Sequence, residues 1–458
     1  MRERCLRFVG VAALCVPAAV AQSNVPSNAV ASDDRAIVEW LRERALPVPA
    51  AASAVSAWTA IDAVLAGAHV VGLGEATHGQ RESFELKRRL TLHLVRDQGF
   101  RIVAYEASST RARACDDYIA GRTSDMQAAL HGLGMLIWRN DENAALLDDL
   151  RAWNQGSKPE DRVRFVGVDV QDGEAAGARL TELLERARSP LAAEAKGLGT
   201  KIEAARDAAY SGGDWRTFTA AAGEVDALLR SVSLAFGEIA AKTSRADAEE
   251  VLTRARELAR FAEAATSAEG RDHAMAQTLL DELARAGAGT KVVLWAHNAH
   301  VTNGPLRYMG TTALGLGGVL AASLGEKYYA LGFLFGEGSF AALAQDADRK
   351  WTFKSYEVPP CPGSVEATFQ RARQGDLIVD LRGAPKDGDV GAWLAQSHPM
   401  RWYGGYNIPD DVVAQSIQLD KLQQIEPRVD FDGLVYIAKT SATRVWEPAG
   451  TGSAGRGK

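Results

Sequence analysis

Residues 70–79 have the sequence VVGLGEATHG, in which a short apolar run ends at a glycine and is followed by a glutamate and a histidine. An apolar run without polar alternation is typical of a strand that is buried on both faces of a parallel sheet. Residues 80–97 then place Leu86, Leu90 and Leu94 at helical spacing, with charged residues between them. A buried strand followed by an amphipathic helix indicates an α/β fold.

Further apolar runs predict the remaining strands, at residues 101–105, 163–168, 291–295, 328–335, 377–381 and 434–437. Residues 35–66 look helical. Between about 173 and 287 the chain is rich in Ala, Glu and Arg and has almost no strand pattern. The sequence therefore predicts an α/β fold with a mostly parallel β-sheet flanked by helices and an inserted all-helical subdomain.

The start of the chain has the pattern of an export signal. Three arginines in the first seven residues precede an apolar stretch, and Ala19-Val20-Ala21 is a small-x-small cleavage site. We therefore expect a periplasmic or secreted protein with no stable membrane insertion after the signal is cleaved. The expected organisation is a signal peptide at 1–21, a linker and helix at 22–66, an α/β catalytic domain at 67–172 and 288–445, a helical insertion at 173–287 and a disordered tail at 446–458.

Composition restricts the class of partner. The net charge is -6 and acidic and basic residues are interspersed, so no basic stripe indicates nucleic acid or an anionic membrane surface. Cys115 and Cys361 remain after signal cleavage. In an oxidising compartment they either form a disulfide or stay unpaired and buried, and the sequence leaves both alternatives open.

Ionisable residues follow four consecutive predicted strands. Ligands of parallel sheets bind beyond the carboxyl ends of the strands, and ionisable groups are seldom buried without a function. Asp169, after the third of these strands, is expected to cap a helix. The expected catalytic residues are Glu75, His78, Glu106, His297 and His300.

Each of these residues also has a purely structural interpretation. Glu75 could cap the next helix, and His78 could be an ordinary loop histidine. Glu106 could pair with Arg111 or Arg113, while His297 and His300 could bond to backbone at a strand end.

Several common motifs are absent from the sequence. It contains no G-x-S-x-G elbow, no H-E-x-x-H and no Walker A loop. Residues 72–77 imitate the start of a dinucleotide motif, but Thr77 replaces its third glycine and Glu75 would repel a pyrophosphate. We expect no cofactor.

The segment 72–79, followed by Glu82 and Phe84, resembles the opening signature of the erythromycin esterase family. The resemblance continues at residues 104–106 and 293–301 and spans roughly 65 to 440. Thr278 departs from it, because an asparagine is expected there. The resemblance implies hydrolysis of an ester or macrolactone without a covalent serine intermediate, and it does not imply that erythromycin is the substrate.

The residues themselves favour the same chemistry. Attack of water on an acyl carbon needs a general base, and His78 precedes a helix start, where an imidazolium is disfavoured. Glu75 could orient it, and Glu106 would face both if its strand were the neighbouring one. Arg81 or Arg271, with His297 or His300, could stabilise the oxyanion of a small-molecule substrate, including a bulky macrolide-like ester. The alternatives are a metal-dependent hydrolase that uses the same Glu/His cluster, and a non-catalytic exported ligand-binding protein.

Overall fold

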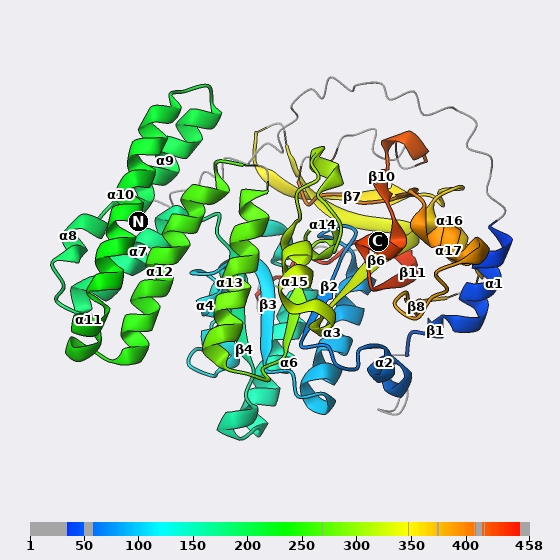
Figure 1. Cartoon of the computed structure of the whole chain (residues 1–458), viewed down its shortest axis with the longest axis horizontal. Coiled ribbons are helices and arrows are strands. Elements are labelled where there is room, and N and C mark those ends of the chain that lie inside the picture. Colours follow the sequence, from blue (N-terminus) through cyan, green and yellow to red (C-terminus); the bar gives the residue numbers. More distant parts are fainter. Residues whose placement is uncertain are drawn as a thin grey trace, which may run out of the picture.

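A mostly parallel sheet lies at the centre of the protein (Figure 1). The structure is a computed structural model that describes residues 34–49, 58–267, 269–346, 348–372, 375–406, 408, 415 and 417–448. The strand order is β1 (Leu46–Pro47), β8 (Leu377–Asp380), β11 (Gly433–Thr440), β6 (Tyr328–Gln345), β2 (Val70–Leu73), β5 (Val292–Trp295), β3 (Ile102–Ser108) and β4 (Arg164–Asp169). Neighbours from β11 to β4 pair parallel, which confirms the predicted α/β fold.

Antiparallel pairs occur at the margins of the sheet. β1 pairs with β8, β8 pairs with β11, and β7 (Trp351–Val358) pairs with the second half of β6. A separate ribbon joins β9 (His398–Met400) to β10 (Gln423–Ile425). β6 runs to Gln345 instead of ending near residue 335 as predicted, because its extension is paired with β7.

Strand β2 is central, and its side chains alternate between the two faces of the sheet. Val71 and Leu73 belong to one hydrophobic cluster, and Val70 belongs to the other. The first face is covered by α2 (Thr59–Val64), α3 (Arg81–Asp97), α4 (Arg113–Ile119), α5 (Met126–Gly132) and α6 (Asp141–Gly156). The second is covered by α1 (Arg35–Arg44), α13 (Gly270–Ala286), α14 (Asn298–Val301), α15 (Leu316–Leu324), α16 (Val365–Ala372), α17 (Gly388–Ala395) and the segment after α19 (Pro427–Asp430).

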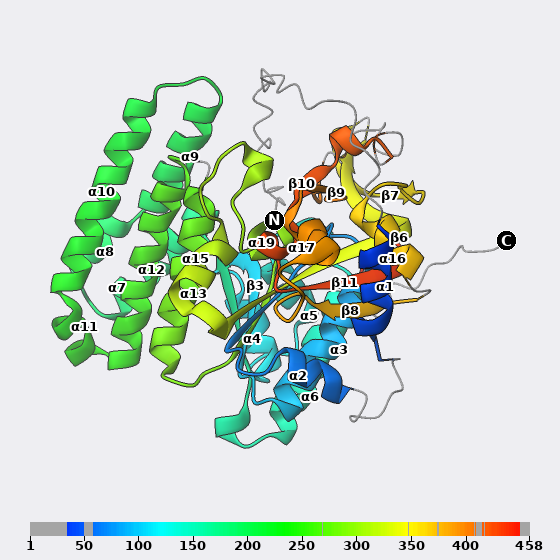
Figure 2. The same cartoon turned by 45° about the vertical axis from the view of Figure 1, so that its right-hand side comes forward.

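A group of helices stands beside the sheet, at the left of Figures 1 and 2. It consists of α7 (Gly173–Arg186), α8 (Leu191–Ala195), α9 (Leu198–Tyr210), α10 (Trp215–Leu234), α11 (Phe236–Lys242) and α12 (Arg245–Ala264), which share a hydrophobic cluster of their own. Met275 and Leu279 of α13 pack instead with the sheet. We call α7–α12 the helical group; the division of the chain into domains stays a prediction.

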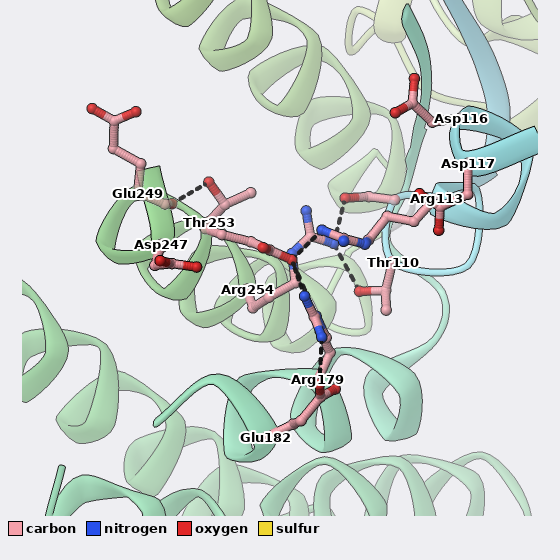
Figure 3. Close-up of polar contacts among 12 residues, drawn as sticks. Thr110, Arg113, Asp116, Asp117, Arg179, Glu182, Asp247, Glu249, Thr253 and Arg254 are labelled. Atoms are coloured by element: carbon pink, nitrogen blue, oxygen red, sulfur yellow. Dashed lines mark hydrogen bonds and ion pairs between the residues drawn. The ribbon is translucent and has the colours of Figure 1, made fainter. Parts of the chain in front are cut away.

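Charged side chains join the helical group to the segment after β3 (Figure 3). Nη1 of Arg254 donates to Oγ1 of Thr110 at 2.8 Å and forms an ion pair with Glu257. Arg113 of α4 and Arg179 of α7 both pair with Glu250. Because Thr110 lies four residues beyond Glu106, the helical group is tied to a strand end that carries an expected catalytic residue.

The N-terminal prediction was partly wrong. Residues 35–66 do not form one helical stretch, because β1 follows α1 and pairs Leu46 with Ile378. Pro47 and Pro49 have no N–H to continue a helix. The predicted signal peptide and most of the predicted tail lie outside the described residues. Within the described part, no helix is long and apolar enough to cross a membrane, and Cys115 and Cys361 are buried and unpaired.

Candidate active site

The five expected catalytic residues meet at the carboxyl ends of β2, β5 and β3. β5 lies between β2 and β3, so the strand that carries Glu106 is not the direct neighbour of β2. The residues still come together because the loop after β5 fills the space between the other two strand ends. Relative exposure ranges from 2% for Glu75 to 8% for His78. The cluster is therefore largely shielded from solvent, which strengthens electrostatic interactions within it.

The loop after β2 is held by close backbone approaches. Asn298 N donates to the carbonyl of Glu75 at 2.9 Å. A Cβ on Gly74 would lie 2.1 Å from Oδ1 of Asn298, and a Cβ on Gly79 would lie 1.9 Å from the carbonyl oxygen of Ala341. Only glycine fits at either position, which explains the two glycines that flank Glu75 and His78.

A buried ion pair orients the first histidine. Oε1 of Glu75 lies 2.6 Å from Nδ1 of His78, and Oε2 lies 2.6 Å from Nζ of Lys87. Nζ of Lys87 also lies 4.6 Å from the centroid of the Trp295 ring. Burial alone would raise the pKa of Glu75, but Lys87 and His78 outweigh it and lower that pKa. Glu75 is therefore ionised and holds the imidazole of His78 through Nδ1.

Glu106 accepts hydrogen bonds from two elements of the site. Its Oε2 accepts from the backbone N–H of His297 at 2.9 Å, and its Oε1 accepts from Nη2 of Arg271 at 2.9 Å. Nε2 of His300 lies 3.3 Å from the same Oε1. Burial opposes ionisation, but these cations, His300 foremost, hold the pKa of Glu106 well below its usual value.

His300 lies between two carboxylates. Nδ1 is 2.8 Å from Oδ1 of Asp272, and Nε2 faces Glu106. Burial lowers the pKa of His300, but Asp272 and Glu106 outweigh it and raise the pKa to about 10. The ring is therefore held as an imidazolium whose Nδ1 donates to Asp272 and whose Nε2 lies beside Glu106. Nη1 of Arg271, 3.1 Å from Nε2, is then a neighbour and not a hydrogen-bond donor to this ring.

His297 has the opposite protonation. Its Nδ1 accepts from the backbone N–H of Ala299 at 3.1 Å, so Nε2 carries the proton and donates to the carbonyl of Tyr403 at 3.1 Å. Burial, followed by the proximity of His78, lowers the pKa of His297 to about 4. His297 is neutral, and both of its nitrogens are engaged by backbone.

His78 alone among these three histidines keeps a nitrogen available. Nδ1 faces Glu75, whereas Nε2 has no hydrogen-bond partner among the residues that the structure describes. The ring lies 5.3 Å from that of His297 and 5.3 Å, edge-on, from that of Trp138. A carboxylate-oriented imidazole with one unengaged nitrogen is suited to act as a general base.

Two indole N–H groups near the histidines are also unsatisfied. Within the described residues, Nε1 of Trp138 and Nε1 of Trp402 are buried without a hydrogen-bond partner. The ring of Trp402 lies 6.0 Å from that of His297. Buried donors are rarely left unpaired in proteins, so both are candidates to donate to an oxygen of a bound substrate.

The two expected arginines differ in position. Arg271 enters the site and also pairs with Asp169, at 2.9 Å between Nη2 and Oδ2. Arg81 does not join this network, because its Nε pairs with Glu85 at 2.8 Å. The expectation that Asp169 caps a helix was wrong, because the side chain that caps α7 is that of Asp172.

The structural alternatives for Glu75 and Glu106 do not describe their contacts. α3 has no side-chain cap, so Glu75 does not cap it. Arg111 pairs with Asp172 and Arg113 with Glu250, leaving Arg271 as the arginine partner of Glu106. Sequence reasoning missed Lys87 and Asp272, although Lys87 follows the opening signature and Asp272 adjoins Arg271.

The described side chains of the cluster form no preassembled set of metal ligands. No group of three or more His, Cys, Asp or Glu side chains in the described ranges is placed to hold an ion. Glu75 and Glu106 accept from N–H donors in this arrangement, and His300 pairs with two carboxylates.

Comparison with known proteins gives consistent relatives. The sequence model of one family, described as erythromycin esterase, matches residues 95–440, a range that begins after the segment with Glu75 and His78. An erythromycin esterase type II from Escherichia coli is 22% identical over 433 residues, covering 83% of this chain and 92% of the relative. A Bacillus cereus protein of known structure has a TM-score of 0.75 at 22% identity, covering 91% of this chain and 100% of that one. A histidine mutant of the erythromycin esterase EreC, in its open conformation, has a TM-score of 0.65 at 17% identity, covering 84% and 94%.

Proposed function

The chain belongs to the erythromycin esterase family and is a hydrolase, and we propose that it cleaves an ester or lactone by water attack, with His78 as general base. One observation carries this proposal: Glu75 holds Nδ1 of the His78 ring, and Nε2 of the same ring has no hydrogen-bond partner among the described residues. His297 is engaged at both nitrogens, and His300 is already protonated. Neither of them can take a proton from water without losing its present contacts.

The proposed reaction has two proton transfers. Nε2 of His78 removes a proton from a water molecule as the water oxygen bonds to the acyl carbon, and the carbonyl electrons move to the oxygen. Glu75 stabilises the imidazolium that forms. The imidazolium then protonates the leaving alcohol oxygen as the carbon–oxygen bond breaks, giving an acid and an alcohol.

The developing oxyanion needs hydrogen-bond donors or positive charge. Arg271 and the imidazolium of His300 supply positive charge beside Glu106, and the unpartnered Nε1 of Trp138 supplies an N–H group near His78. Arg81, which pairs with Glu85, would have to leave that partner to take part.

The substrate is proposed to be a small-molecule ester or lactone, including bulky macrolide-like ones, in line with the names of the relatives. The helical group would form one wall of the binding cleft, because it is tied to the segment that follows Glu106. Export to the periplasm or the medium is part of the proposal and rests on residues 1–21. Interspersed charges give no support for a nucleic-acid partner.

A panel of esters and lactones tests the activity, run on the wild type and on His78→Asn, with and without a chelator. Turnover that resists the chelator and disappears in the variant supports the proposal. Turnover that the chelator abolishes favours the metal-dependent alternative, and binding without turnover favours a ligand-binding protein.

A further inference from the structure

Residues 402–405 lie across the loop that carries Glu75 and His78, and we call them the strap. Tyr403 N donates to the carbonyl of Ala76 at 2.7 Å, and Oγ1 of Thr77 donates to the carbonyl of Gly404 at 3.3 Å. Leu343 N donates to the carbonyl of Gly405 at 2.8 Å. The strap is thus bonded to the loop after β2 on one side and to β6 on the other.

The strap contacts two of the site histidines. The carbonyl of Tyr403 accepts from Nε2 of His297, which leaves Nδ1 of that ring to accept from the backbone N–H of Ala299. Gly405 packs against His78 so closely that a Cβ would lie 2.8 Å from Cδ2 of that imidazole. Real Cβ atoms essentially never approach that closely, so either the ring or the strap would have to move.

A buried arginine anchors the start of the strap. Arg401 is fully buried, and its guanidinium donates to the carbonyls of Pro359, Phe335 and Gly336. Its backbone N–H donates to Oε1 of Glu366 at 2.8 Å. The residue that precedes the strap is therefore bonded to β6. This anchor limits how far the strap can shift away from His78.

We propose that the strap is a positioning element of the active site, and that Gly405 must lack a side chain so that His78 keeps its bond to Glu75. Because the ring of His78 already lies edge-on to Trp138, a methyl group on Gly405 pushes the imidazole within a crowded space. The inference rests on the proposed role of His78 as general base. A misplacement of about 1 Å in a reacting group costs about 100-fold in rate.

The adjacent glycine provides a matched control. A Cβ on Gly404 would meet nothing within 4 Å, and neither glycine has a positive φ. Gly404→Ala and Gly405→Ala therefore add the same methyl group to neighbouring positions, and only the second one meets His78. Thr77→Val is a further variant, because it removes a bond to the strap without touching either histidine ring.

The experiment measures kcat and KM of the full chain with p-nitrophenyl acetate, together with imidazole ¹⁵N spectra of histidine-labelled protein. Gly405→Ala should lose about 100-fold in kcat, with KM little changed and the resonances of His78 and His297 shifted. Gly404→Ala should match the wild type in rate and spectrum. Thr77→Val should shift the same two resonances and leave that of His93 in place.

Equal behaviour of the two glycine variants, in rate and in spectrum, would overturn the proposal. If Gly405→Ala does not fold, the spectrum of Thr77→Val decides, and unshifted His78 and His297 resonances count against a positioning role. Failure of the general-base assignment is a separate result, because it appears as full activity in His78→Asn. The ¹⁵N spectra of the glycine and threonine variants report on the position of the His78 ring whether or not that ring is the base.

Discussion

Nδ1 of His78 lies 2.6 Å from Oε1 of Glu75, and that carboxylate is buried against Lys87. A carboxylate, a base and a cation thus form one connected unit at the end of β2. The unit leaves Nε2 of His78 without a hydrogen-bond partner among the described residues, and the proposed general-base role depends on this arrangement.

The Glu75–Lys87 pair should separate catalysis from stability. Glu75→Gln keeps the shape but removes the charge that stabilises the imidazolium, so kcat should fall by about 100-fold or more. Lys87→Met leaves a buried carboxylate without its cation and should cost about 3–5 kcal/mol in the free energy of unfolding. Urea unfolding of the single and double variants measures the free energy of unfolding, and steady-state assays of the same variants measure kcat. The double variant should regain stability over Lys87→Met but no activity, and additive losses would contradict a coupled pair.

The protein should lose stability at alkaline pH, because the contacts of His300 favour its protonated form. The pKa of His300 is about 10 in the folded protein, whereas an unfolded histidine titrates near 6.5. Below about pH 6.5 the stabilisation from the contacts of protonated His300 is fully present. As the pH rises from there through about 10, the folded state holds one more proton than the unfolded state, so the free energy of unfolding falls.

Asp272→Asn tests this sign, since it removes a carboxylate that raises the pKa of His300. The variant should lose less stability than the wild type between pH 6 and pH 9, measured by urea unfolding. Asp281→Asn on the same helix is the control and should follow the wild type. The same slope in all three proteins would show that His300 is not held as an imidazolium.

The helical group should tune substrate choice more than turnover. Its described residues include none of the site histidines or their carboxylate partners, and exposed charges such as Arg216 and Arg245 cover its surface. Alanine scanning of residues 180–265 should change the ratio of kcat/KM between small and bulky esters while activity persists. A residue there as essential as His78 would refute this division.

Export should leave Gln22 as the first residue. The arginines near the start, the apolar stretch and Ala19-Val20-Ala21 predict cleavage after position 21. Mass spectrometry of the protein made in a Gram-negative host measures the N-terminus directly. Intact Met1 in the soluble cytoplasmic fraction would be incompatible with this expectation.

The fold and the site residues that follow strands could be anticipated from the sequence for one physical reason. An apolar run that ends at a polar residue identifies a strand and its functional end together, so Glu75, Glu106 and His297 were found locally. The order of the strands could not be anticipated in this way, because crossovers place β5 between β2 and β3 without a local signal.

Residues on helices and in irregular segments were missed for a related reason. Lys87 and Asp272 lie within amphipathic helices, where a charge ordinarily indicates a solvated face. Their burial depends on which helix face meets the site. The roles proposed for Tyr403 and Gly405 depend on a backbone carbonyl and on the absence of a side chain, which no residue pattern indicates.

The most direct test of the account is the rate of His78→Asn on an ester that the wild type hydrolyses, with a chelator present throughout. A general base typically contributes about 100- to 10,000-fold, so kcat/KM should fall on that scale while the unfolding curve stays the same. A folded His78→Asn enzyme that works at the wild-type rate would contradict the account, as would a wild type that the chelator inactivates.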